Sequence, residues 1–197
     1  IETEKFRGIE LSKTQRIAVR EAINRGVFVI TGGPGTGKTT TLKVLIDIFE
    51  SMDKVIKLAA PTGRAAKRMK EQTGREAFTI HKLLEIGFAG DIGFSNVEEL
   101  ECDVLILDEV SMVDILLMET LLKAIESPTR LILVGDKDQL PSVGAGNVLA
   151  DILKSGVVES VNLEEIFRQS EQSMIVKNAH LINKGEMPIL NVGDFFM

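Results

Sequence analysis

A stretch of eight residues near the start of the chain has the composition and spacing of a phosphate-binding loop. Gly32–Thr39 reads G-x-x-x-x-G-K-T, and it lies between the apolar run Val27–Ile30 and a helical pattern over Thr40–Phe49. Glycines allow a tight turn, so that backbone N–H groups and the following helix N-terminus converge on phosphate oxygens. We call Gly32–Thr39 the P-loop. A chance glycine-rich turn would not be expected to combine all the fixed residues with both flanking elements.

The P-loop predicts a nucleotide site that contains Mg²⁺. Lys38 is expected to reach the β- and γ-phosphates, and the Thr39 hydroxyl is expected to be one ligand of the metal ion. The residues that we expect to contact the nucleotide here are Gly33, Pro34, Gly35, Thr36, Gly37, Lys38, Thr39 and Thr40.

Two adjacent carboxylates follow a second apolar run. Asp103–Leu107 contains four apolar residues without alternation, which indicates a strand buried on both faces. Asp108 and Glu109 come next, at the strand end where ligands bind in open α/β sheets. We expect Asp108 to hold Mg²⁺, through water, and Glu109 to orient and deprotonate the water that attacks ATP. A hydrolase needs such a base, whereas a kinase would activate a substrate hydroxyl.

Two more polar side chains could act on the γ-phosphate. Gln139 follows the apolar run Arg130–Val134 and could sense the γ-phosphate as a neutral donor and acceptor. Arg168 is the only arginine in the last third of the chain, and a guanidinium beside the γ-phosphate accelerates phosphoryl transfer. From spacing alone, surface roles for both residues remain equally open.

The elements that must position these side chains alternate between strands and helices. This order predicts an α/β fold with a largely parallel sheet and right-handed crossovers. Glu85–Leu100 is expected to be a surface excursion such as a hairpin, and Thr79–Leu84 to begin a helix. The predicted strands are Val27–Thr31, Val55–Ala60, Asp103–Leu107, Arg130–Val134 and Val157–Leu163. The other predicted helices are Ser12–Arg25, Thr40–Phe49, Ala65–Gln72, Asp114–Ala124, Asn147–Leu153 and Gln172–Asn183.

Three features have both a structural and a functional interpretation. Ser12 followed by Gln15 forms a helix capping box, and from spacing alone this role of Gln15 is favoured. His81 is expected at a helix end or half-buried rather than in a site. One helix carries the only dense basic patch, which is either a solvated face or a binding surface. The patch consists of Arg64, Lys67, Arg68 and Lys70.

Composition limits the class of protein. The 197 residues are enough for one α/β domain, and the formal net charge of −6 argues mildly against a non-specific nucleic-acid binder. The single cysteine, Cys102, fits a reducing compartment, and neither a signal peptide nor a membrane span is visible, so we expect a cytoplasmic protein with no membrane partner. The chain begins with Ile1 and ends in Asp194–Met197, which looks like an interrupted strand, so we expect a partial chain.

In combination these segments resemble superfamily 1 DNA helicases, in particular the RecD-like branch (the exodeoxyribonuclease V alpha-subunit family) that moves 5′ to 3′. The resemblance covers about residues 11–196 and predicts a RecA-like P-loop NTPase domain with helices on both faces of the sheet. The segments that carry it are Thr79–Leu84, Asp108–Asp114, Val134–Gly146 and Leu163–Gln169, together with Gln15, the P-loop and Ala60–Arg64.

The resemblance implies roles that the residues alone leave open. Gln15 matches the glutamine that reads adenine, Gln139 the motif that couples nucleotide to DNA, and Arg168 the arginine that contacts the γ-phosphate. In this family, the strand at Arg130–Val134 lies between the P-loop strand and the Asp108 strand. The positions that match residues along single-stranded DNA are Pro61, Thr62, Gly63, Arg64, Thr79 and His81.

The match departs from the wider superfamily in two places. Ser142–Gly144 stands where the other branch often has an aromatic residue that stacks on bases, so DNA contact should rely more on backbone and phosphate. By this resemblance we expect residues 1–197 to correspond to the first motor domain (1A), with the second motor domain outside this chain. We therefore expect an ATP-dependent helicase motor that works with a second domain in cis and with recombination or repair nucleases as partners. Two alternatives remain: a P-loop switch or clamp loader without translocation, and a non-enzymatic regulatory domain.

Overall fold

The computed structural model describes residues 8, 10–86, 99–165 and 173–194. In this part of the chain, six strands and their connecting helices alternate along the sequence. The strands are β1 (Val27–Gly32), β2 (Ile56–Ala60), β3 (Phe78–Thr79), β4 (Val104–Leu107), β5 (Arg130–Gly135) and β6 (Ser160–Leu163). The helices are α2 (Lys13–Asn24), α3 (Lys38–Ser51), α4 (Gly63–Thr73), α5 (Ile80–Leu83), the 3-10 helix η1 (Val110–Met112), α6 (Ile115–Ala124), α7 (Val148–Ser155) and α9 (Met174–Asn183).

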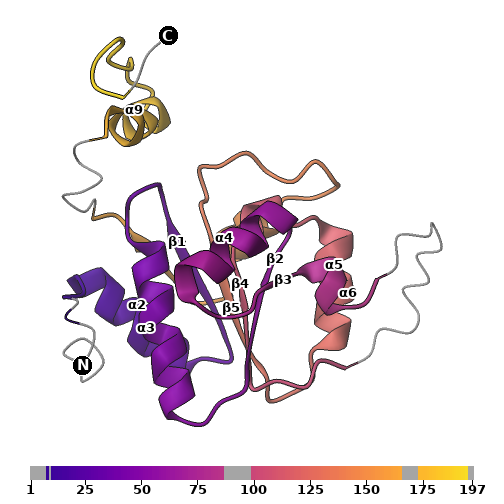
Figure 1. Cartoon of the computed structure of the whole chain (residues 1–197). Helices are drawn as coiled ribbons and strands as arrows, with labels where there is room; N and C mark the ends of the chain where they lie inside the picture. Colours follow the sequence, from indigo (N-terminus) through magenta and orange to yellow (C-terminus); the bar gives the residue numbers. More distant parts are fainter. Residues whose placement is uncertain (1–7, 9, 87–98, 166–172, 195–197) are drawn as a thin grey trace.

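The strands form a single parallel sheet in the order β3-β2-β4-β5-β1-β6. Helices α2, α3 and α4 lie on one face, and α5 and α6 lie on the other (Figure 1). Because all the strands run the same way, the loops that follow them meet at one edge of the sheet. The order places β5 between β1 and β4, as the family resemblance predicts.

The apolar strands show no alternation because both faces of the sheet are covered. Successive strand residues point to opposite faces. In β4, Val104 and Ile106 pack into the core under α2 and α3, whereas Leu105 and Leu107 pack into a second core on the side of α6 and α7. The strand run is therefore apolar at every position, and this confirms the predicted strand that is buried on both sides.

The predicted helices and strands are found, with shifts at their ends. The P-loop helix α3 starts at Lys38, two residues before the predicted Thr40, because the last P-loop residues already form its first turn. The two-residue strand β3 was not predicted, since it is too short to show a period. The middle of the expected excursion, residues 87–98, lies outside the described residues, as do the last three residues of the chain.

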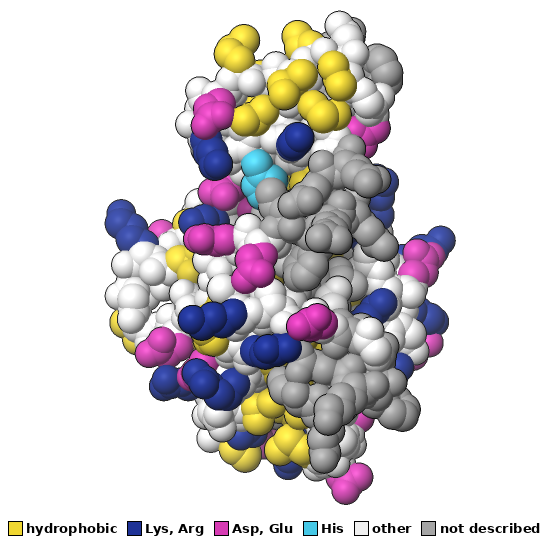
Figure 2. All heavy atoms as spheres, turned by 90° about the vertical axis from the view of Figure 1, so that its left-hand side faces the viewer, with side chains coloured by type: hydrophobic (Ala, Val, Ile, Leu, Met, Phe, Trp, Pro, Cys, Tyr) yellow, Lys and Arg dark blue, Asp and Glu magenta, His cyan; other side chains and the backbone are white. Residues whose placement is uncertain are grey.

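Two observations concern the surface of the molecule. In the described part of the chain, no helix has both the length and the apolar character that crossing a bilayer requires. Exposed apolar side chains gather on the segment that contains α9, at the top of Figure 2. These side chains are Ile175, Ile182, Met187, Ile189, Leu190 and Val192.

Candidate nucleotide and DNA site

The loops that follow β1, β4 and β5 surround a cleft of about 620 Å³. It lies at the carboxyl edge of the sheet, where the strand order predicts a ligand site. Predicted residues from these three loops therefore meet in space although they are far apart in the sequence. The cleft is lined by the P-loop from Gly33 to Thr39, by Thr40, Asp108, Glu109, Asp136 and Gln139, and by Arg68, Gln72 and Val176.

The backbone of the P-loop has the conformation that a phosphate cradle requires. Gly35 and Gly37 have φ values of 77° and 80°, a region that residues with a side chain rarely adopt. A Cβ atom on Gly32 would lie 2.5 Å from Oγ1 of Thr36, whose hydroxyl donates to the Gly33 carbonyl at 2.9 Å. Helix α3 then begins at Lys38, so its N-terminal N–H groups and dipole face the cleft.

Lys38 lies inside the cleft and is bound by the loop itself. Its ammonium group donates to the carbonyls of Gly32 and Gly33, the latter at 3.0 Å. Burial lowers the pKa of Lys38, and the nearby carboxylates, of which Asp136 has the largest effect, oppose this shift. A buried ammonium group that is bound only by backbone carbonyls can form stronger, charge-assisted hydrogen bonds to the oxygens of a phosphate.

Asp108 and Glu109 project into the cleft from the end of β4. Burial raises the pKa of the Asp108 carboxyl, the negative charge of Glu109 raises it further, and the Glu109 N–H, which donates to Asp108 Oδ1 at 2.9 Å, opposes the shift. Glu109 has a φ of 55°, so a residue with a side chain holds a left-handed conformation here. Backbone strain of this kind is found at functional sites, where the surrounding structure maintains it.

Gln139 reaches the cleft from the loop after β5. Its Oε1 atom accepts a hydrogen bond from Oγ of Ser111 at 2.9 Å, and Ser111 is buried two residues beyond Glu109. The loops that carry Gln139 and Glu109 are thus linked directly. The Nε2 group of Gln139 takes no part in the bond to Ser111, so it could donate to the γ-phosphate, as the predicted sensor role requires.

Gln15 forms the predicted capping box and also contacts the P-loop, beside the cleft rather than in its lining, and its predicted contact with adenine stays a prediction. Its Oε1 atom accepts from the Ser12 N–H at 2.9 Å and its own N–H donates to Ser12 Oγ at 3.3 Å, which completes the capping box of α2. Its Nε2 group donates to the Gly37 carbonyl at 3.2 Å. The side chain is almost fully buried, so the start of α2 is joined to the P-loop through this one residue.

Several residues that line or cover the cleft were not predicted to have a role there. Arg68 and Gln72 come from α4, and Asp136 follows β5. His180 comes from α9: its Nε2 atom lies 3.2 Å from the Pro34 carbonyl, and a Cβ atom on Gly33 would lie 2.9 Å from its Cε1. The basic patch gave a signal for Arg68, whereas nothing in the sequence connects His180 with a loop almost 150 residues earlier.

The predicted DNA-contacting positions meet beside the cleft, at the ends of β2 and β3. Because Ala60 and Thr79 are paired across these strands, Pro61–Arg64 lies next to Thr79–His81. Thr62 accepts from the Ala65 N–H and Thr79 from the Lys82 N–H, so both threonines cap helices. Gly63, Arg64 and His81 are exposed. Local structure alone accounts for the threonines, and it leaves the exposed positions without a structural role in the fold.

Two further observations delimit the site. Arg168 lies outside the described residues, so its predicted contact with the γ-phosphate stays a prediction.

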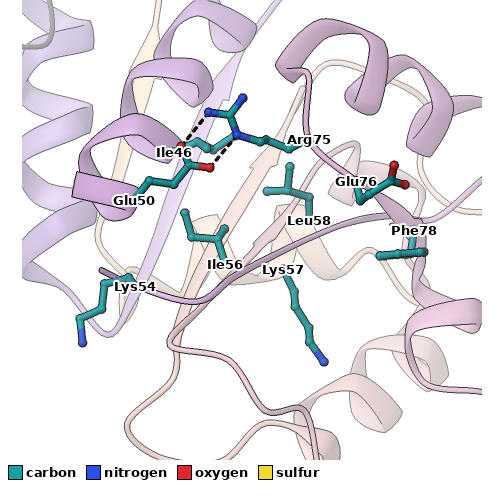
Figure 3. A pocket seen from close by; sticks show the side chains of 9 residues that line it. All are labelled: Ile46, Glu50, Lys54, Ile56, Lys57, Leu58, Arg75, Glu76 and Phe78. Atoms are coloured by element: carbon teal, nitrogen blue, oxygen red, sulfur yellow. Dashed lines mark hydrogen bonds and ion pairs between the residues drawn. The ribbon is translucent and has the colours of Figure 1, made fainter. Parts of the chain in front are cut away.

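A second cavity of about 260 Å³, between α3, β2 and β3, contains none of the predicted residues (Figure 3). There Arg75 makes two short hydrogen bonds to Glu50, of 2.6 and 2.7 Å. The hydrogen bond and the negative charge of Glu50 raise the pKa of the Arg75 guanidinium. This arginine is fully engaged in a structural pair.

Comparison with known proteins supplies a family for this arrangement. A family model described as AAA domain matches residues 10–194. The chain belongs to this AAA domain family. The match includes the P-loop, the carboxylates of the cleft and the predicted DNA segments, so the predicted α/β P-loop NTPase fold is confirmed.

Relatives of this AAA domain chain include a RecD2 DNA helicase and RecD subunits of RecBCD enzymes. It is 41% identical over 178 residues to the ATP-dependent RecD2 DNA helicase of Deinococcus radiodurans, a match over 90% of the chain and 24% of that protein. It is 40% identical over 165 residues to the RecBCD enzyme subunit RecD of Mycolicibacterium smegmatis, a match over 71% of the chain and 30% of that protein. The chain thus spans about a quarter to a third of the length of these relatives, and the resemblance to the RecD-like branch is confirmed.

Solved structures of Pif1 helicases share the fold. The Pif1 helicase from Candida albicans superimposes with a TM-score of 0.69 at 25% identity, over 91% of this chain and 45% of that one. Pif1 from Bacteroides sp in complex with ADP-AlF4 gives a TM-score of 0.60 at 28% identity, over 85% of this chain and 45% of that one. In both cases the AAA domain chain corresponds to less than half of the helicase.

Proposed function

We propose that residues 1–197 are the first motor domain of an ATP-dependent DNA helicase that moves 5′ to 3′ on a single strand. The observation that carries this proposal is the shared edge of the sheet. The nucleotide cleft lies at the ends of β1, β4 and β5, and the predicted DNA segments lie beside it at the ends of β2 and β3. A motor needs both sites on one rigid element, because the energy of the nucleotide cycle must change the contacts with the strand.

The residues of the cleft fit a nucleotide with Mg²⁺. The P-loop amides and Lys38 would hold the phosphates, and Gln15, which lies beside the P-loop and outside the lining of the cleft, would contact adenine. The Thr39 hydroxyl and the Asp108 carboxylate are oxygen donors of the kind that Mg²⁺ prefers. A nearby cation would stabilise the charged form of Asp108 and so oppose the increase in its pKa that burial causes. When bound, Mg²⁺ would neutralise charge on the β- and γ-phosphates.

The chemistry assigned to this chain is the attack of water on the γ-phosphorus of ATP. Glu109 would orient the water and accept its proton as the new P–O bond forms, while the bond to the β-phosphate oxygen breaks and ADP leaves. Lys38 would stabilise the negative charge on the phosphates. Gln139 would report the loss of the γ-phosphate to the neighbouring loop through Ser111. Arg168 would add a second positive charge at the γ-phosphate.

A second motor domain would complete the cleft and the DNA track. The exposed apolar side chains around α9 support this, since soluble proteins rarely leave such groups uncovered without an interaction partner. Closure of the two domains on ATP and their reopening after hydrolysis would move the strand. We place the protein in the cytoplasm with single-stranded DNA as its substrate, and recombination or repair nucleases as its partners.

Strand displacement by the full-length protein tests this function. Two duplexes with the same sequence, one with a 5′ single-stranded tail and one with a 3′ tail, are supplied with ATP and Mg²⁺. The proposal predicts unwinding of the 5′-tailed duplex, no unwinding of the 3′-tailed one, and no unwinding by a Glu109→Gln variant. ATP hydrolysis without displacement of either strand would instead favour a switch or clamp loader.

A further inference from the structure

One stripe of α4 connects the predicted DNA segment with the nucleotide cleft. Arg64, Arg68 and Gln72 are spaced by four residues, so they lie one above another along the same side of the helix. Arg64 is at the end that follows the predicted DNA-contacting loop. Arg68 and Gln72 line the cleft, one and two turns farther on. The middle residue of the stripe therefore lies slightly more than one helical turn, about 6 Å along the axis, from each of its neighbours.

Gln72, at the C-terminal end of the stripe, is hydrogen-bonded to the last residue of the P-loop. The Thr39 hydroxyl donates to Oε1 of Gln72 at 3.3 Å, which places this part of α4 against the start of α3. On the opposite side of α4, Ala66 and Met69 are buried in the fold, with exposed fractions of 5% and 1%. The backbone of α4 is thus held by the bond at Gln72 and by the buried residues on its other side. A ligand that binds along the stripe would therefore move side chains and not the helix.

The side chain of Arg68 is free to move, unlike the backbone of the helix. Its Nη1 atom lies 4.0 Å from Oε1 of Glu109, the predicted base, and its side chain is 67% exposed. This is a loose ion pair at the edge of the solvent, and such pairs are weak. In contrast, Arg75 at the end of the same region holds Glu50 with two short hydrogen bonds. A guanidinium held as loosely as that of Arg68 can exchange one anion for another.

We propose that Arg68 is a positioning residue that restrains Glu109 through their ion pair until the guanidinium binds a phosphate of single-stranded DNA instead. The strand phosphate would bind between Arg64 and Arg68, and Glu109 would then be free to orient the attacking water. Arg68 would in this way make hydrolysis depend on DNA without any movement of α4. The inference rests on the proposed function, because it assumes that the strand passes the start of this helix.

The experiment measures ATP turnover of the full-length protein with and without single-stranded DNA. Arg68→Ala removes the restraint, so the DNA-free rate should rise about twofold to fivefold, as expected for a weak ion pair. The rate at saturating DNA should stay near that of the wild type, and the stimulation ratio should fall by the same factor. Arg68→Lys, which keeps the positive charge, should retain most of the stimulation.

Lys67→Ala is the matched control. Lys67 is the neighbouring cation on α4, it is more exposed than Arg68, and it is paired with Glu71 at 3.9 Å, away from Glu109. Its removal should leave both rates unchanged. The salt dependence of strand binding adds a second measurement: Arg68→Ala should lower the slope of log affinity against log salt by about one, because one phosphate contact is lost.

The outcomes separate the inference from the function on which it rests. If the wild type shows no stimulation by DNA, the proposed function fails and the inference fails with it. If the wild type is stimulated but Arg68→Ala lowers both rates by the same factor, Arg68 serves the nucleotide and the inference alone is wrong. A stimulation ratio or a salt slope that matches that of Lys67→Ala would also overturn it.

Discussion

The two halves of the sheet edge are built differently. In the nucleotide half, side chains bond across elements: Gln15 reaches the Gly37 carbonyl, and Ser111 reaches Gln139. In the DNA half, Thr62 caps its own helix and Arg64 and His81 are exposed. The first half is therefore organised before its ligand arrives, whereas the second presents exposed groups that would gain fixed positions if a strand binds there, as proposed. Substitutions should accordingly change chemistry in the first half and affinity in the second.

The largest effect should come from Glu109→Gln in the nucleotide half. The amide keeps the shape of the side chain but cannot accept the proton of the attacking water, so turnover should fall about 100-fold or more. ATP binding should change little, because Glu109 is assigned to the water and not to the phosphates. Single-turnover hydrolysis and nucleotide titration separate the two quantities. Unaltered turnover would refute the assignment of Glu109 as the base.

A smaller effect is expected from Gln15→Glu. The carboxylate can still accept from the Ser12 N–H, so the capping box is kept, but it loses the Nε2 donor that contacts the Gly37 carbonyl. If the Nε2 group also contacts adenine, as proposed, the loss of that hydrogen bond should weaken ATP binding by about two- to tenfold. The preference for ATP over GTP should fall as well, if Gln15 reads adenine. Competition titrations with the two nucleotides measure both, and an unchanged preference would leave Gln15 with its structural role alone.

In the DNA half, Arg64→Ala should weaken binding of single strands several-fold without changing ATP binding. Loss of one phosphate contact should also lower the salt slope of binding by about one. Fluorescence anisotropy of a labelled strand at several salt concentrations provides the measurement. If strand affinity and slope both equal those of the wild type, the DNA half does not lie along the strand.

The smallest effect concerns the stability of the ligand-free protein. The pKa of Asp108 is raised in the folded state by burial and by Glu109. A raised pKa means that the folded state binds the proton more tightly, so the contribution of Asp108 to stability is present at acid pH and is lost as pH rises through the folded pKa. Asp108→Asn should therefore raise the melting temperature at pH 7 and leave it unchanged near pH 3. A lower melting temperature at pH 7 would contradict this sign.

Much of the fold and of the nucleotide half could be predicted because short segments determine them. The run Val104–Leu107 predicted a strand buried on both faces, and the P-loop pattern fixed the turn and the start of α3. Strand β3 was missed because its two residues show no period, and its pairing with β2 depends on the tertiary fold.

Other parts of the site depend on contacts between distant residues, which spacing does not reveal. His180 covers the P-loop from a helix at the other end of the chain, and Arg68 faces Glu109 only because β2 lies beside β4. For Gln15 the spacing gave the capping box, whereas its bond to the Gly37 carbonyl joins residues 22 positions apart and needed the tertiary fold. The DNA half was predicted from the family resemblance, because spacing alone favours local structural roles for its threonines and its histidine.

The central claim, that this edge of the sheet binds ATP with Mg²⁺, is tested most directly by calorimetric titration of Mg·ATP into the chain of residues 1–197. The account predicts one site whose affinity depends on Mg²⁺ and falls about tenfold or more in Lys38→Ala, since a charge-assisted contact to phosphate is lost. Absence of binding to the wild type, or equal binding to Lys38→Ala, would contradict it.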